Sequence, residues 1–139
     1  MAERYVLDTS AILAFLGDEA GAGKVERLLR GAQAGRHEIL ACAITLMELF
    51  YTAMRTTGED GAAYVVALVR AWPLGWVYPD EKILLHAGRL KATSRLSVAG
   101  ALIAAVADRH DATLVHKDPE LKALRGRIEL LDLPAREER

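Results

Sequence analysis

The sequence predicts an α/β protein, a three-layer α/β/α sandwich built on a mainly parallel central sheet. Short apolar runs at 5–7, 38–42, 75–78, 112–115 and 128–131 are typical of buried strands, and amphipathic or capped segments between them are typical of helices. Strands that alternate with helices form βαβ units, which place helices on both faces of a parallel sheet. The length of 139 residues fits one domain. We expect a single domain over residues 1–135 and a charged tail over residues 136–139.

The first half of the chain is divided by glycine, proline and capping residues. In chain order we expect a strand at 5–7, helices at 11–16 and 23–34, a strand at 38–42, and helices at 45–55 and 61–72. The sequence Asp8-Thr9-Ser10 can cap the first helix. Thr57-Gly58 separates the third helix from the fourth, which cannot continue through Pro73.

The second half follows the same alternation. We expect a strand at 75–78, helices at 80–93 and 97–110, a strand at 112–115, a brief helix that begins at 118, and a last strand at 128–131. Ser97 can cap the second of these helices. Asp118 followed by Pro119 favours the start of the brief helix, because aspartate suits the cap and proline suits the first helical turn.

Composition excludes several classes of protein. Apolar residues make up 52% of the chain and charged residues 27%, which is typical of a folded protein and not of a disordered one. The 18 basic and 19 acidic residues lack the excess positive charge of a passive nucleic-acid coat. A single cysteine, Cys42, allows neither a disulfide framework nor a thiolate zinc site within one chain. No apolar run approaches the ~20 residues of a membrane span, and we expect a cytoplasmic protein without membrane contact.

Three acidic residues are candidates for a functional site. Asp8 and Asp118 each follow a predicted strand, and the functional groups of open α/β sheets collect at the carboxyl ends of strands. Glu48 is the only charged residue between Glu38 and Arg55, and a carboxylate on an apolar helix costs free energy unless it has a partner or binds a metal. Together these acids form an oxygen-only set of the kind that Mg²⁺ prefers.

Each acid also has a purely structural interpretation. Asp8 could merely cap the first helix, and Asp118 could merely cap the brief helix that starts at Pro119. Glu48 stands three residues after Thr45 and could complete a Thr-x-x-Glu capping box. The combination of all three acids, and not any one of them, favours a shared site.

Four segments of the chain, in order, resemble the four motifs of the PIN-domain family. They are residues 6–13 (VLDTSAIL), 45–49 (TLMEL), 96–107 (LSVAGALIAAVA) and 112–118 (ATLVHKD). The likeness runs from Tyr5 to about Leu131, and the compact length resembles the toxin half of VapBC-type toxin–antitoxin pairs. It implies an endoribonuclease that hydrolyses RNA phosphodiester bonds with Mg²⁺, or Mn²⁺, held by carboxylates.

The resemblance also implies roles and partners. Asp8, Glu48 and Asp118 would be the catalytic and metal-binding acids, and Thr9 or Ser10 would hydrogen-bond a ligating carboxylate from behind. The expected partners are an RNA substrate, a cognate antitoxin protein that covers the acidic pocket, and a second copy of the chain in a homodimer.

One departure from the family pattern concerns the metal site directly. The family has an aspartate where this chain has Gly100, so that one expected carboxylate is lost. Glycine inside a helix also costs about 1 kcal/mol relative to alanine. Gly100 could mark a variant inactivated deliberately or by selection, a natural member that has lost full activity, or a close helix contact. We favour the first because the other three acids are intact, and we expect weakened metal binding and strongly reduced cleavage.

Other functions remain as alternatives. The main one is a non-catalytic PIN-fold module that binds RNA or an antitoxin protein and needs no Mg²⁺. A dehalogenase-type phosphotransferase would need an aspartate where Ser10 stands, and a receiver-like domain would need one after Cys42. His116 stands where the family often has a small hydroxyl residue, and we expect it to be a solvated histidine at the end of a strand.

Overall fold

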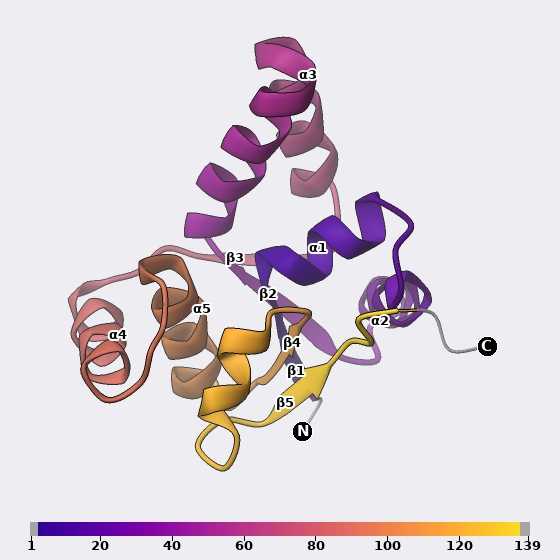
Figure 1. Cartoon of the computed structure of the whole chain (residues 1–139). Coiled ribbons are helices and arrows are strands. Elements are labelled where there is room, and N and C mark those ends of the chain that lie inside the picture. The colour runs from indigo at the N-terminus through magenta and orange to yellow at the C-terminus, as the bar shows by residue number, and fades with distance from the viewer. Residues whose placement is uncertain (1–2, 137–139) are drawn as a thin grey trace.

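The computed structural model describes residues 3–136 and contains one five-stranded sheet with helices on both faces (Figure 1). The elements are β1 (Arg4–Leu7), α1 (Thr9–Leu16), α2 (Ala22–Gln33), β2 (Glu38–Cys42), α3 (Ile44–Arg70), β3 (Gly75–Val77), α4 (Glu81–Thr93), α5 (Val98–Arg109), β4 (Thr113–His116), the 3₁₀ helix η1 (Pro119–Leu124) and β5 (Leu130–Asp132). The expected three-layer α/β/α architecture is confirmed. Of the charged tail expected over residues 136–139, residues 137–139 lie outside the described part.

The sheet has the strand order β3-β2-β1-β4-β5, and all of its pairings are parallel. β1 therefore lies in the middle, with Tyr5 opposite Ile39 of β2 on one side and Thr113 of β4 on the other. Val6 and Leu7 of β1 are fully buried, one on each face of the sheet. A strand buried on both faces reads as a continuous apolar run, which explains why the sequence predicts it well.

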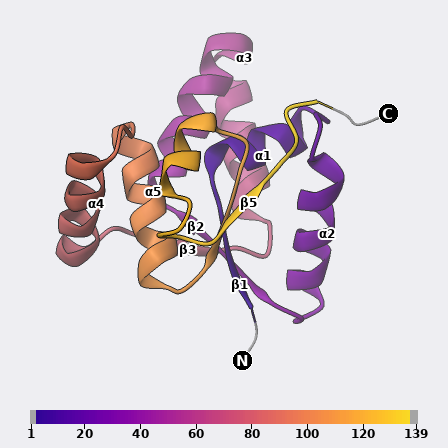
Figure 2. The ribbon, with the colours of Figure 1, turned by 60° about the horizontal axis from the view of Figure 1, so that its bottom comes forward.

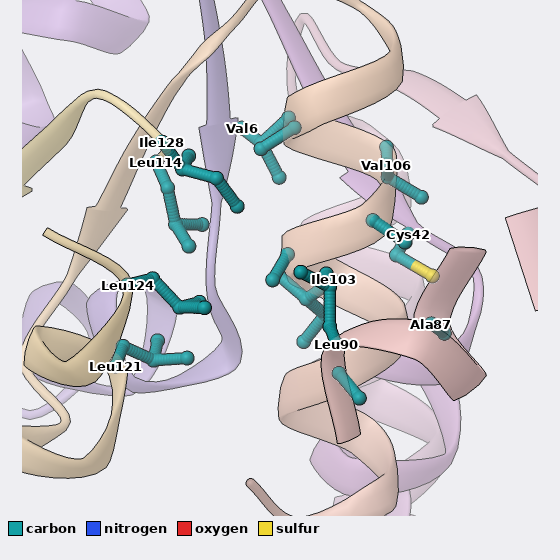
Figure 3. Close-up of a cluster of buried hydrophobic side chains, with 14 of the residues drawn as sticks. Val6, Cys42, Ala87, Leu90, Ile103, Val106, Leu114, Leu121, Leu124 and Ile128 are labelled. Carbon is teal, nitrogen blue, oxygen red and sulfur yellow. The ribbon is translucent and has the colours of Figure 1, made fainter. Parts of the chain in front are cut away.

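Two hydrophobic clusters fill the space between the sheet and its helices. One cluster joins the sheet to α4, α5 and η1, and the other joins it to α1, α2 and α3. Figure 2 shows α4 and α5 on one side of the sheet and α2 on the other. In the first cluster, Leu121 and Leu124 of η1 point toward Ile103 of α5 (Figure 3), and all three side chains are fully buried.

The third and fourth predicted helices form the two arms of α3. Gly58 interrupts the helix with φ 74° and ψ −176°, a conformation that favours glycine. Figure 1 shows α3 rising away from the sheet and then folding back toward it. The predicted break at Thr57-Gly58 is therefore confirmed, although the arms start at Ile44 and end at Arg70.

Smaller differences occur near the carboxyl end of the chain. The brief helix after Asp118 is a 3₁₀ helix, and β4 extends to His116. The last strand begins at Leu130, since Ile128 makes only an isolated bridge with Arg125. No single helix within residues 3–136 is long and apolar enough to span a membrane, and α4 and α5 reach that length and apolarity only as a pair bent by 117°.

Candidate functional site

The three acids singled out in the sequence lie around one cavity of about 170 Å³. Asp8 comes directly after β1, Asp118 follows β4, and Glu48 comes from the first arm of α3. β1 and β4 are neighbours in the sheet, with Leu7 opposite Val115, so their carboxyl ends bring Asp8 and the 116–118 segment together. The residues that line the cavity are Asp8, Thr9, Ser10, Leu13, Glu48, Tyr51, Thr52, Ser97, Gly100 and Asp118.

Asp8 is the most buried of the three acids, with 5% of its surface exposed. Its carboxylate accepts hydrogen bonds from the backbone N–H of Ser10, at 3.0 Å, and from the Ser10 hydroxyl. The same hydroxyl oxygen accepts the backbone N–H of Lys117 at 2.9 Å, which ties the loop after β1 to the loop after β4. Burial raises the pKa of Asp8 and the Ser10 hydrogen bonds oppose this, while the negative charge of Asp118 adds to the rise. Asp8 therefore caps α1 and also faces the cavity.

Glu48 does not form the capping box that the sequence allowed. α3 begins at Ile44 after Ala43, and no side chain caps it. Instead, the Thr9 hydroxyl donates a 2.6 Å hydrogen bond to Glu48 Oε1 and lies 3.0 Å from the Thr45 hydroxyl oxygen. Burial raises the pKa of Glu48 and the Thr9 hydrogen bond opposes this, while the nearby charges of Asp8, Asp118 and Glu120 raise it further. The interpretation of Glu48 as part of a capping box with Thr45 is therefore wrong.

Asp118 caps η1 by accepting the backbone N–H of Glu120 at 3.1 Å. Its own N–H donates to His116 Nδ1 at 3.1 Å. His116 is 1% exposed, so the expectation of a solvated histidine is wrong. Because Nδ1 accepts this bond, the proton of a neutral ring sits on Nε2, which donates to Asp132 Oδ1 at 2.5 Å. Burial alone would raise the pKa of Asp132, but hydrogen bonds from Arg125 and His116 outweigh it and lower the pKa.

Gly100 lies on the wall of the same cavity, in the first turn of α5. Its N–H donates to the Ser97 hydroxyl oxygen at 3.0 Å, which caps the helix as expected. A Cβ at this position would lie 2.8 Å from Glu120 Oε1, 3.0 Å from Ser97 Oγ and 3.6 Å from Leu121 Cδ2. The close-packing interpretation thus has a physical basis. The nearest atom, Glu120 Oε1, is the end of a side chain, so an aspartate here requires that carboxylate to move.

The donor set fits a hard divalent cation, although it does not form a closed cage. Within residues 3–136, no group of three or more acids, histidines or cysteines is arranged to hold a metal ion directly. Mg²⁺ keeps several of its waters and is usually bound through one or two carboxylates, so it does not need such a cage. Burial is the main cause of the raised pKa of Asp8 and of Glu48, and repulsion from neighbouring carboxylates adds to it; a bound cation would relieve that repulsion. A larger hollow of about 760 Å³, lined by Lys24, Arg27 and Lys122 among others, contains none of the three acids.

Four residues of the cavity wall were not assigned to the site from the sequence: Leu13, Tyr51, Thr52 and Ser97. Tyr51 and Thr52 line the cavity beside Glu48. They follow Glu48 by three and four residues, and residues with this spacing share one face of a helix. The spacing from Glu48 was therefore a usable signal.

The fold and the site define an α/β protein whose acids gather at the carboxyl edge of a parallel sheet. Its sequence matches the PIN-domain family over residues 5–127, nearly the whole chain. The chain belongs to the PIN-domain family, as its motifs predict. A comparison with curated proteins finds no match.

Several solved structures with the same fold are of toxins or toxin–antitoxin complexes. The VapBC2 complex of Rickettsia felis, bound to a DNA fragment from its promoter, has a TM-score of 0.73 at 20% identity, with 94% of this chain and 99% of that chain covered. DNA-bound VapBC from Salmonella typhimurium has a TM-score of 0.73 at 22% identity, covering 95% and 98%. VapC20 of Mycobacterium tuberculosis, a toxin that cleaves the sarcin–ricin loop, has a TM-score of 0.67 at 16% identity, covering 87% and 95%. At these identities the likeness shows a shared fold.

Proposed function

We propose that this chain is a toxin-type endoribonuclease that hydrolyses RNA phosphodiester bonds with a divalent cation, Mg²⁺ or Mn²⁺, at the cavity between Asp8, Glu48 and Asp118. The observation that carries the proposal is that these acids, from three distant segments of a PIN-domain chain, line one cavity. The structural similarity to VapC20, which cleaves the sarcin–ricin loop, supports RNA as the substrate.

The chain's own residues would bind the cation and hold its ligands still. Asp8, Glu48 and Asp118 offer carboxylate oxygens, and the cation would lower the pKa of a bound water and stabilise charge on the phosphate. Thr9 holds Glu48 through its 2.6 Å hydrogen bond, and Ser10 holds Asp8. These hydrogen bonds fix the direction of the carboxylates, as outer partners of metal ligands commonly do.

Gly100 is expected to weaken this site without removing it. One acid of the family pattern is absent, so fewer negative charges face the cation. We propose that metal binding and cleavage are reduced relative to a chain with aspartate at this position.

The proposed partners are an antitoxin and a second copy of the chain, in the cytoplasm. The similar structures include toxin–antitoxin complexes, which supports an antitoxin as the partner. The first arm of α3 offers an apolar surface beside the cavity, where Met47, Tyr51 and Met54 are 55%, 40% and 47% exposed. An antitoxin bound there would sit next to the acids and could occlude them.

The test compares this chain with its Gly100→Asp variant. Mn²⁺ binding is measured by calorimetry, and cleavage of a structured RNA is measured with and without Mg²⁺, with Asp8→Asn as the control for contaminating nuclease. We expect weak binding and slow metal-dependent cleavage by this chain, at least tenfold stronger binding by Gly100→Asp, and no cleavage by Asp8→Asn. If neither chain binds metal or cuts RNA, the protein is a PIN-fold binding module and the nuclease proposal is wrong.

A further inference from the structure

The space next to Gly100 is taken by another acid, Glu120. Its Oε1 atom lies 2.8 Å from the point that a Cβ on residue 100 would occupy. The same oxygen accepts the backbone N–H of Ser97, the cap of α5, at 2.9 Å. In a capping box this bond is made by an acidic or amide side chain at the third residue of the helix. Here the third residue is Gly100, and Glu120 makes the bond from η1.

The position of Glu120 is fixed by the packing of η1. Leu121 and Leu124 are fully buried in the cluster beneath α5, and Leu121 Cδ2 lies 3.6 Å from the same Cβ point. The backbone N–H of Glu120 also donates to the carboxylate of Asp118. The start of η1 therefore positions two acids, Asp118 at the cavity wall and Glu120 beside the Cβ point of Gly100.

Glu120 is not itself one of the residues that line the cavity, but Ser97 and Gly100, the two residues that its Oε1 atom approaches, are. Within residues 3–136, no lysine or arginine forms an ion pair with Glu120, and its Oε2 atom makes no hydrogen bond. One carboxylate oxygen is therefore engaged by the helix cap, and the other has no protein partner there.

We propose that Glu120 partly replaces the carboxylate that is missing at position 100, so that a weaker fourth acid of the site comes from η1 instead of α5. This inference rests on the proposed function, because it names a further metal-side acid of the same site. The observed place of Glu120 depends on the absence of a side chain on Gly100, since a Cβ there would lie only 2.8 Å from Glu120 Oε1. An aspartate at position 100 and Glu120 in its observed place are thus alternatives.

The test is a double-mutant square made of this chain, Glu120→Gln, Gly100→Asp and the double variant. Glutamine keeps an oxygen that can accept the Ser97 N–H, so it removes the charge and preserves the cap. Mn²⁺ affinity is measured by calorimetry, with thermal unfolding as a check on the fold and RNA cleavage as a separate readout. Glu129→Gln, which neutralises an exposed acid directly before β5, at the end of the parallel sheet away from the cavity, is the matched control.

We expect Glu120→Gln to lower Mn²⁺ affinity about tenfold when glycine is at position 100, the scale seen when partners around a metal site are lost. In the Gly100→Asp background the same change should lower affinity less than about twofold, and the Glu129→Gln control should leave the affinity unchanged in both backgrounds. Equal effects of Glu120→Gln in both backgrounds, or none in either, would show that Glu120 is only a helix cap. That result overturns this inference and leaves the proposed function standing if Gly100→Asp still binds metal and cuts RNA. Absence of metal binding in all four chains overturns both.

Discussion

The hydrogen bond between Thr9 and Glu48 can be removed almost without a change of shape, by Thr9→Val. Thr9 is 5% exposed, and its hydroxyl lies 2.6 Å from Glu48 Oε1 and 3.0 Å from Thr45 Oγ1. Hydrogen bonds to charged groups contribute about 1.5–3 kcal/mol to stability. Glu48 is only half-buried, so water replaces part of the lost bond and we expect a loss near the lower end, about 1.5 kcal/mol.

Urea unfolding at pH 7 measures this loss. For a chain of this size we expect the midpoint to fall by roughly 0.5–1.5 M with an unchanged slope. The Thr9 bond opposes the rise in the pKa of Glu48, so the loss is largest where Glu48 is ionised and shrinks as pH falls through that pKa. Mn²⁺ affinity should fall as well, because Glu48 loses the group that orients it.

Thr9→Ser is the matched control, since it keeps the hydroxyl and loses one methyl group. It should retain most of the metal affinity. A Thr9→Val protein with the stability and the Mn²⁺ affinity of the parent would refute the reasoning that Thr9 holds Glu48 in place.

Three further changes test other parts of the structure. Burial raises the pKa of Asp8, so the metal-free folded state loses stability as pH rises through that pKa. Asp8→Asn should therefore raise the melting temperature more at pH 7 than at pH 4. An equal gain at both pH values would contradict this. His116→Leu removes the acceptor of the Asp118 N–H and the donor to Asp132. It should lower the free energy of unfolding, measured with urea, by about 1–3 kcal/mol. Gly58→Ala should lower the free energy of unfolding by about 1–3 kcal/mol through backbone strain alone, since no atom lies within 4 Å of the added Cβ. An unchanged free energy of unfolding would mean that the bend in α3 relaxes freely.

Much of the fold could be predicted because its signals are local. β1 and β2 are buried on both faces and appear as short apolar runs, and β2 has the predicted limits, 38–42. Asp80 and Ser97 cap α4 and α5 through hydrogen bonds to residues three positions away, so a short stretch of sequence contains the whole signal.

The misinterpretations concern contacts between residues distant in sequence. His116 is buried against Asp132, which lies 16 residues away, and nothing near His116 in the sequence indicates that partner. The Thr45–Glu48 pair has the spacing of a capping box, but Glu48 bonds Thr9, 39 residues earlier. The role of Glu120 has no local signal in the sequence either, because its bond to Ser97 spans 23 residues.

The central place of β1 has a consequence for how the chain is made. β1 is synthesised before both of its neighbours, and one of them, β4, begins only at Thr113. Asp8 therefore lacks this partner strand and Asp118 until residues 113–118 have left the ribosome. A nascent or prematurely terminated chain that stops before this point lacks a wall of the cavity. A chain that cuts RNA with this architecture would gain its activity only after the segment through Asp118 has been synthesised.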